Sequence, residues 1–301
     1  MNDDLIEAVD PREEYVACAS ALASGEASAR EDLRIVLTAM HGVGAAITSR
    51  VLAEAGFSNV SLVAAQAQPD PDFPTVPFPN PEEAGALDMA IEQAREQGAD
   101  LIIAVDPDAD RCALAVPDPA SETGWSPLSG DQIGSLLGEF LASRGMKGSL
   151  ANSIVSSRLL SRIARAHGLE HHTTLTGFKW IARAPGLGFG YEEAIGFCPD
   201  PAHVRDKDGI ATSVVAASLV AALKAQGRSV WDELERLARL HGLHVSSPLT
   251  FRVEEIAQIG SGMARLRAQP PAVLAGSPVV EVSDLSQGYR GLPPTDGVLV
   301  L

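Results

Sequence analysis

The chain carries Leu101-Ile102-Ile103-Ala104-Val105, followed directly by Asp106-Pro107-Asp108-Ala109-Asp110-Arg111. An unbroken apolar run of this length is typical of a buried strand. The aspartates then occupy every second position, so a chain that stays extended past the strand places their carboxylates on one side. Oxygen ligands grouped in this way favour Mg²⁺, and Arg111 adds a planar cation suited to phosphate. The run predicts a metal-assisted phosphate site at the carboxyl end of a strand, where open α/β sheets place ligands.

Two other interpretations of residues 106–111 stay open on spacing alone. One is an aspartate-rich turn that binds no metal. The other is a phosphatase that uses Asp106 as its nucleophile, since a strand followed by Asp-x-Asp also suits that chemistry. A calcium-binding EF-hand loop is disfavoured, because its sixth position requires Gly and holds Arg111, and its twelfth requires Glu and holds Pro117.

The rest of the chain alternates short apolar runs with amphipathic segments. Strands are predicted at residues 33–37, 60–64, 101–105, 113–116, 151–155 and 249–253. Helices are predicted at residues 5–23, 45–55, 82–97, 131–143, 157–167, 210–225 and 231–241. Alternation of this kind indicates α/β architecture with parallel or mixed sheets. The expected fold is two consecutive α/β/α domains with mixed sheets, over residues 1–120 and 121–245, followed by residues 246–301.

Composition narrows the classes of function. The formal net charge is −16, which disfavours non-specific binding to nucleic acid or to an anionic membrane. The longest uncharged stretches, Gly209 to Leu223 among them, are too short to span a bilayer. The three cysteines show neither a metal-binding spacing nor a disulfide framework, and the first residues lack the pattern of a signal peptide. We therefore expect a cytoplasmic protein with no nucleic-acid or membrane partner.

Several short motifs share one family resemblance, and they occur in that family's order. They are Thr-Ala-Met-His-Gly-Val-Gly at 38–44, the acidic run at 106–111, Ser-Gly-Asp-Gln-Ile-Gly at 129–134, Thr-Gly-Phe-Lys-Trp-Ile at 176–181, Gly-Tyr-Glu-Glu-Ala-Ile-Gly at 190–196 and Asp-Lys-Asp-Gly at 206–209. Together they resemble the α-D-phosphohexomutases, the phosphoglucomutase and phosphomannomutase family. The sequences Glu-Glu-Ala-Ile-Gly and Gly-Phe-Lys-Trp are most similar to the branch of this family with phosphopentomutase-like members. The resemblance spans almost the whole chain.

The resemblance implies a role for each matched residue. Asp106, Asp108 and Asp110 would hold Mg²⁺, and Arg111 and Lys179 would contact the phosphate or sugar oxygens of the substrate. The family's third-domain loop commonly reads Gly-Glu-x-Ser-Gly. Aligned on Gly196, this pattern places its glutamate on Glu193 and its serine on Ile195, so the glutamate is kept and the hydroxyl is lost. Glu193, with Glu192 beside it, is thus expected to bind sugar hydroxyls.

Two motifs of the family are absent from the sequence. No Ser-His-Asn occurs, which is the signature of the phosphoserine loop in the first domain, and no Arg-Pro-Ser-Gly-Thr-like phosphate loop of the fourth domain occurs. We therefore expect a central piece of a mutase: the second domain, the third domain and a short part of the fourth at residues 246–301. No catalytic nucleophile is identified, and the isolated chain is expected to be inactive.

The implied reaction is the Mg²⁺-dependent interconversion of a hexose 1-phosphate and a hexose 6-phosphate. It proceeds through a phosphoserine and a sugar bisphosphate, so sugar phosphates and bisphosphates are the expected partners. Two alternatives stay open. A pentose phosphate could be the substrate, because the loop departs from the family pattern at Ile195. A truncated, non-catalytic chain could bind only Mg²⁺ and sugar phosphate.

Other polar residues are expected to be structural. Gly42-Val43-Gly44 is interpreted as a tight turn in which His41 is hydrogen-bonded, and Asp208 as the N-cap of the long helix that follows. His171-His172 lacks a third metal ligand and is interpreted as surface. Ser156-Ser157-Arg158 begins a helix and is a candidate phosphate contact.

Overall fold

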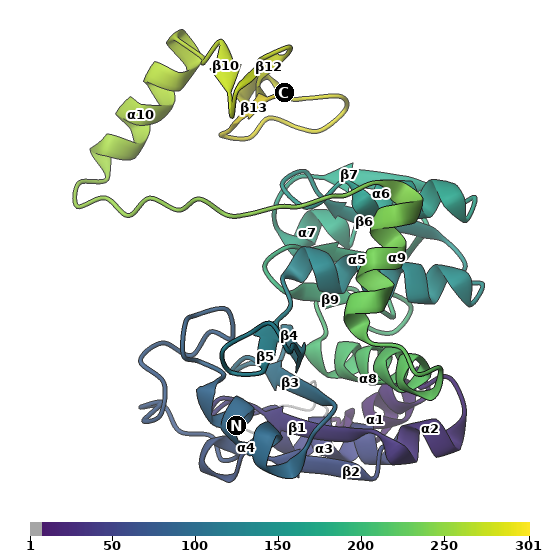
Figure 1. The fold of residues 1–301 in the computed structure, drawn as a ribbon. Coiled ribbons are helices and arrows are strands. Elements are labelled where there is room, and N and C mark those ends of the chain that lie inside the picture. The colour runs from purple at the N-terminus through teal and green to yellow at the C-terminus, as the bar shows by residue number, and fades with distance from the viewer. Residues whose placement is uncertain (1–7) are drawn as a thin grey trace. The chain divides into compact units, whose positions relative to one another are not determined.

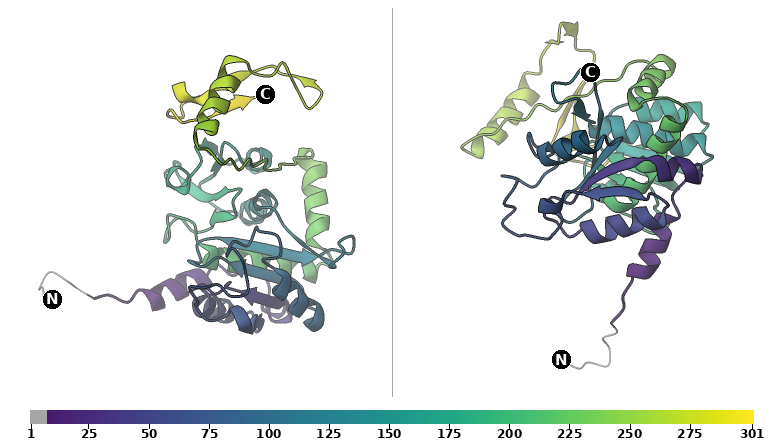
Figure 2. Two further views of the ribbon diagram at one scale, coloured as in Figure 1. Left: turned by 90° about the vertical axis from the view of Figure 1, so that its left-hand side faces the viewer. Right: turned by 60° about the horizontal axis from the view of Figure 1, so that its bottom comes forward.

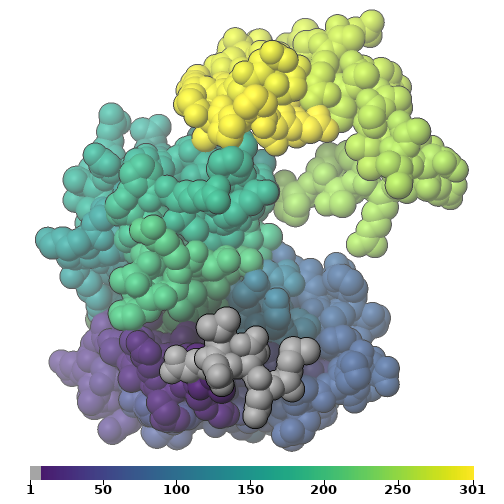
Figure 3. All heavy atoms as spheres, turned by 180° about the vertical axis from the view of Figure 1, so that it is seen from behind, coloured from purple at the N-terminus to yellow at the C-terminus, as the bar shows by residue number. Residues whose placement is uncertain are grey.

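A computed structural model describes residues 8–301 of the chain, which divide into two compact units. The first extends to Val245 and the second spans Ser246–Leu301. The first unit contains both large sheets, which Figure 1 shows as the purple-to-blue and the teal-to-green parts of the ribbon. Figure 2 gives two further views of the same elements. In Figure 3 the residues of these two parts touch along a broad front.

The first sheet is mixed and has the strand order β2-β1-β3-β4-β5. β1 pairs in parallel with β2 and β3, whereas β4 runs antiparallel to both β3 and β5. Its strands are β1 (Arg34–Thr38), β2 (Asn59–Leu62), β3 (Leu101–Val105), β4 (Cys112–Pro117) and β5 (Trp125–Pro127). The helices in this part of the chain are α1 (Arg12–Ser20), α2 (Ala27–Asp32), α3 (Ala45–Glu54) and α4 (Asp88–Gln97), with a short 3₁₀ helix η1 (Ala64–Gln66).

The second sheet is also mixed, with the order β7-β6-β8-β9. β6 pairs in parallel with β7 and β8, and β9 runs antiparallel to β8. Its strands are β6 (Ser149–Ser153), β7 (His171–Thr174), β8 (Leu187–Glu192) and β9 (Gly196–Cys198). The accompanying helices are α5 (Gly130–Ser143), α6 (Leu159–Ala166), α7 (Phe178–Ile181), α8 (Gly209–Ala225) and α9 (Val230–His241).

Helix α8 follows the second sheet in the sequence but packs against the first. It contacts α2, α3, β3 and β4, and it carries no charged residue before Lys224. Most of its side chains are buried, as expected of a helix that is apolar on every face. Asp208 caps its first turn by accepting a hydrogen bond from the Ala211 N–H at 2.8 Å, which confirms the predicted N-cap. The helix also contacts α5 and β9, and one cluster of buried apolar side chains spans both sheets.

Several predicted boundaries shift. The helix predicted at 82–97 begins only at Asp88, because residues 81–87 form turns. The helix predicted at 5–23 corresponds to α1, and residues 5–7 of that prediction lie outside the described residues. The strand predicted at 249–253 is wrong: these residues have no regular structure, and Leu249 and Phe251 are exposed. A strand needs both a pairing partner and a covered face, and this segment has neither.

The second unit is small. It contains α10 (Ala257–Ala268), two antiparallel strand pairs and a 3₁₀ turn, η2 (Leu285–Gln287). The pairs are β10 (Val273–Leu274) with β11 (Ser277–Pro278) and β12 (Val282–Asp284) with β13 (Val298–Val300). Within residues 246–301, all of which the structure describes, Leu285 is the only buried apolar side chain. The identification of this unit as part of a fourth domain stays a prediction.

No single helix among residues 8–301 is long and apolar enough to cross a membrane. Helices α8 and α9 pass that test of length and composition only as a pair, and they are bent by 92° relative to each other.

A buried hydrogen-bonded chain links β7 to α5 through the second sheet. His171 Nε2 lies 2.9 Å from Asn152 Oδ1, Asn152 Nδ2 donates to the Tyr191 hydroxyl, and that hydroxyl donates to Asp131 Oδ1 at 2.8 Å. The surface interpretation is therefore wrong for His171, which is partly buried in β7. Burial, together with the neighbouring His172, lowers the pKa of His171 to about 4.

The depressed pKa of His171 predicts acid sensitivity. The unfolded chain binds a proton at His171 below about pH 6.5 but the folded chain only near pH 4, so stability is lost as the pH falls through this window. Between pH 7 and pH 5 the loss is about 1–2 kcal/mol of unfolding free energy. Urea denaturation at both pH values measures it. The variant His171→Gln removes this titration and should lose less stability; an equal loss in both proteins would contradict the assignment.

Candidate metal and substrate site

The acidic loop is a tight turn at the carboxyl end of β3. The Ala109 N–H donates to the Asp106 carbonyl at 2.9 Å, and Ala109 has a positive φ of 61°. The chain therefore does not stay extended through these residues, which was the condition for the aspartates to share one side by spacing alone. The turn nevertheless brings the aspartates together: ligand atoms of Asp106, Asp108 and Asp110 all lie within 4.8 Å of one another. The three carboxylates form a group that could hold a metal ion.

Asp106 is buried and is held by Arg111. The Arg111 N–H donates to Asp106 Oδ1 at 3.0 Å and its Nε donates to Oδ2 at 2.7 Å, while Nη1 donates to Asn80 Oδ1 at 3.2 Å. Burial raises the pKa of Asp106 above its usual value, although the hydrogen bonds and the charge of Arg111 oppose this effect. Arg111 is thus fixed in orientation by two partners, Asp106 through Nε and Asn80 through Nη1.

The turn at residues 41–44 packs against the acidic loop. The Val43 N–H donates to the Pro107 carbonyl at 2.9 Å, and a Cβ added to Gly42 would lie 2.3 Å from the Pro107 Cα. His41 is buried, and its Nε2 lies 2.8 Å from the Thr75 hydroxyl. These contacts agree with the structural interpretation of both Gly42 and His41.

The second half of the chain supports the acidic loop from the other side. The Gly209 N–H donates to the Ala109 carbonyl at 3.1 Å, and the Cys112 N–H donates to the Ile195 carbonyl at 3.1 Å. Arg111 also forms a backbone bridge with Gly196. A Cβ on Gly209 would lie 2.3 Å from the Arg111 carbonyl oxygen, so only glycine fits there. Both halves of the first unit therefore position the loop.

Lys207 is the site residue that sequence reasoning missed. Its ammonium lies 2.8 Å from Asp110 Oδ2 and 5.7 Å from the centre of the Phe178 ring. Burial alone would lower the pKa of Lys207, but the hydrogen bond and charge of Asp110 outweigh it and the pKa is raised. A lysine beside the N-cap Asp208 gives little signal in the sequence, because charged residues before a helix are common.

The two glutamates of the loop after β8 have separate environments. Glu193 Oε2 accepts hydrogen bonds from the hydroxyls of Ser153 at 2.9 Å and Ser156 at 2.7 Å, so its carboxylate is tied to the second sheet. Glu192 instead lies beside Lys207, with Asp110 and Arg111 also close enough to affect its charge. Burial raises the pKa of Glu192, and Lys207 opposes the rise.

The remaining candidates are less closely connected. Lys179 is exposed on α7, next to Phe178, whose ring faces Lys207. Ser156 holds Glu193, and the Ser157 N–H donates to Asp131 Oδ1 at 2.7 Å, so both serines have structural partners. The structure thus brings Asp106, Asp108, Asp110, Arg111, Lys207 and Glu192 together around the acidic loop.

The fold and this loop define a class of protein: a pair of α/β/α domains that together support an acidic turn whose three carboxylates could hold a metal ion. Residues 13–120 match the family model "Phosphoglucomutase/phosphomannomutase, alpha/beta/alpha domain II", and residues 129–240 match the corresponding domain III. The chain therefore belongs to the phosphoglucomutase/phosphomannomutase family. The matches also confirm the predicted fold class of two consecutive α/β/α domains with mixed sheets.

Individual relatives agree with the family assignment. The chain is 44% identical over 286 residues to a probable phosphomannomutase of Haemophilus influenzae, covering 94% of this chain and 57% of that protein. It is 32% identical to a probable phosphoribomutase of Schizosaccharomyces pombe, over 90% of this chain and 49% of that protein. A putative phosphomannomutase from Thermus thermophilus superimposes with a TM-score of 0.66 at 25% identity, covering 78% of this chain and 52% of that one. The chain spans about half the length of the curated relatives it matches.

Because Gly209 lies against the backbone of the acidic loop, adding a single methyl group there should strongly destabilise the fold. Alanine within a helix usually stabilises relative to glycine by about 1 kcal/mol, but at Gly209 the added Cβ would overlap two loop carbonyls. Gly209→Ala should lower the free energy of unfolding by about 1–3 kcal/mol, measured by urea denaturation. Gly262→Ala in α10, where a Cβ meets nothing within 4 Å, is the control. Equal stability of Gly209→Ala and the parent protein would contradict the packing.

Proposed function

We propose that this chain supplies the metal-binding and sugar-binding parts of a phosphosugar mutase. The reaction is the interconversion of a hexose 1-phosphate and a hexose 6-phosphate through a phosphoserine and a sugar bisphosphate. The observation that carries the proposal is the grouping of three aspartates with two cations and Glu192 around one loop. Since no Ser-His-Asn occurs in the sequence, the proposal assigns this chain no nucleophile.

The donor set suits Mg²⁺. This ion prefers oxygen ligands at about 2.0–2.1 Å, so two oxygens on one ion lie no more than about 4.2 Å apart. The ligand atoms of Asp106, Asp108 and Asp110 already lie within 4.8 Å of one another, so small side-chain rotations suffice. When bound, Mg²⁺ would offset negative charge on a phosphoryl group, which is a main contribution to phosphoryl transfer.

Each neighbouring residue has a role that its contacts support. Arg111, held by Asp106 and Asn80, presents a fixed planar cation to phosphate. Lys207 adds a second positive charge beside Asp110, and Lys179 is the further cation proposed to reach phosphate. Glu192 is the better candidate for sugar hydroxyls, since Glu193 already accepts hydrogen bonds from two serines.

The identity of the sugar depends on this same loop. Ile195 is buried and offers no hydroxyl, so a hexose phosphate and a pentose phosphate both remain candidate substrates.

The proposal also includes domain limits at residues 120 and 245 and a cytoplasmic location. Three free cysteines in the described part of the chain support a reducing compartment.

Metal and ligand binding test the proposal directly. Isothermal titration calorimetry of the purified chain with Mg²⁺ should detect metal binding. A second titration with glucose 1,6-bisphosphate, in the presence of Mg²⁺, should detect binding of the sugar bisphosphate. Asp108 is exposed, so Asp108→Asn should fold normally but weaken Mg²⁺ binding by at least about tenfold. Asp72→Asn, another exposed aspartate, is the control and should bind as the parent does. A folded chain that binds neither ligand would overturn the proposal.

The two glutamates should differ when each is replaced by alanine. Glu192→Ala should lower the affinity for glucose 1,6-bisphosphate by about tenfold, because a charged hydrogen-bond acceptor is lost, with little change in stability. Glu193→Ala should lower the free energy of unfolding by about 1–2 kcal/mol, because Ser153 and Ser156 lose their shared partner. Calorimetry and urea denaturation measure the two effects. The reverse pattern would assign the sugar contact to Glu193.

A further inference from the structure

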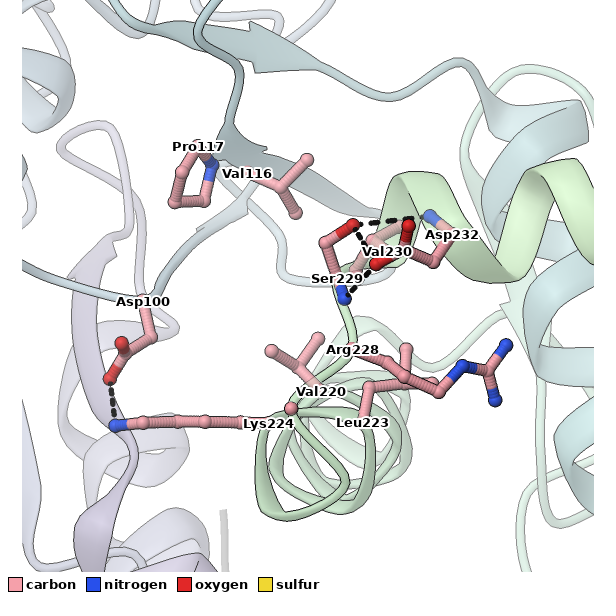
Figure 4. A pocket seen from close by; sticks show the side chains of 11 residues that line it. Asp100, Val116, Pro117, Val220, Leu223, Lys224, Arg228, Ser229, Val230 and Asp232 are labelled. Atoms are coloured by element: carbon pink, nitrogen blue, oxygen red, sulfur yellow. Dashed lines mark hydrogen bonds and ion pairs between the residues drawn. The ribbon is translucent and has the colours of Figure 1, made fainter.

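A cavity lies at the other end of β3 from the acidic loop. Asp100 precedes β3 and Asp106 follows it, so the two ends of the strand are about 20 Å apart. The cavity has a volume of about 360 Å³, within the range of small-molecule sites. Figure 4 shows it between the end of α8, the start of α9 and strand β4. The activity proposed above makes no use of it.

The walls of the cavity are mostly apolar. Val116 and Pro117 of β4 form one side, and Val220 and Leu223 of α8 face them across the opening (Figure 4). Val230, at the start of α9, closes a third side. All of these residues except Pro117 are buried. The apolar body of a ligand that contacts them would therefore be removed from water.

The cations at this cavity are already engaged. Lys224 Nζ lies 2.8 Å from Asp100 Oδ2, 2.9 Å from the Asp32 carbonyl oxygen and 3.1 Å from Asp32 Oδ2, which together match its three N–H donors. Arg228 points away from the cavity in Figure 4 and pairs with Glu233. The first turn of α9 is capped by Ser229 and Asp232. An anionic ligand would therefore have to displace existing partners.

The carboxylates, in contrast, have spare acceptors. Asp100 uses Oδ2 for both Lys224 and the Arg34 N–H, and Asp232 uses Oδ2 for Ser229. Within residues 8–301, no hydrogen bond is made to Oδ1 of either residue. Figure 4 places Asp100 and Asp232 on opposite sides of the apolar walls. Both carboxylates thus offer a free acceptor oxygen, and of the two only Asp232, which is exposed at the rim, has no cation paired with it in the described part of the chain.

From this arrangement we infer that the cavity bounded by Val116, Val220, Leu223 and Val230 is a binding site for a small organic cation, an amine or amidine on an apolar body. The body fills the space between β4 and α8, and its N–H groups donate to the free oxygen of Asp232, while Asp100 lies on the opposite side of the cavity, paired with Lys224. The site is separate from the acidic loop, so its occupation requires neither Mg²⁺ nor a sugar phosphate.

Three molecules of nearly identical shape test the inference: benzamidine, which is a cation, benzamide, which is neutral, and benzoate, which is an anion. The full chain is labelled at its Val and Leu methyl groups, and each compound is titrated by NMR. Benzamidine should shift the methyl signals of Val116, Val220, Leu223 and Val230. It should bind at least about fivefold more tightly than benzamide and more tightly still than benzoate.

Variants separate the charge from the shape of the cavity. Asp232→Asn keeps an amide oxygen that can accept from Ser229, so it should fold, and it should reduce the preference for benzamidine over benzamide. Asp72→Asn removes a charge outside the cavity and should leave this preference unchanged. Leu223→Phe fills the cavity and should weaken all three compounds. The inference is overturned if benzamidine leaves these methyl signals unshifted, if the three compounds bind equally, or if Asp232→Asn keeps the full preference.

Discussion

Close approach of backbone segments to the acidic loop is the constraint on which the site depends. Gly42 lies against Pro107 on one side, and Gly209 lies against the carbonyls of Ala109 and Arg111 on the other. A turn that carries three carboxylates would otherwise be pushed apart by its own charge. Held between two backbone walls, it keeps a positive φ at Ala109 and presents its aspartates as a group.

Electrostatic balance is the second requirement. Asp106 is buried, and a buried carboxylate is tolerated only when its oxygens have partners. Arg111 supplies both a backbone and a side-chain donor, and Lys207 supplies a counter-charge to Asp110 from the segment before α8. One cation comes from the loop itself and the other from the far half of the chain. The charge distribution of the site therefore exists only when both sheets have formed.

The parts of this structure that follow from local pattern could be predicted from the sequence. The buried strand β3, the uncharged helix α8 and its cap at Asp208 all depend on neighbouring residues. The role of Lys207 and the different environments of Glu192 and Glu193 could not be predicted, because they depend on how the loops after β8 and β9 face the first sheet. Residues 249–253 alternate apolar and polar side chains, yet no other strand pairs with them, so the local pattern was misleading.

The path of α8 also has a consequence for synthesis on the ribosome. The first sheet ends with β5, but the helix that covers part of it is not complete until Ala225. At typical translation rates the intervening residues take about 5–20 s to appear. During that interval β3 and β4 of the nascent sheet lack the cover that α8 gives them in the finished protein. The first sheet therefore cannot reach its final packing until the second half of the first unit has emerged.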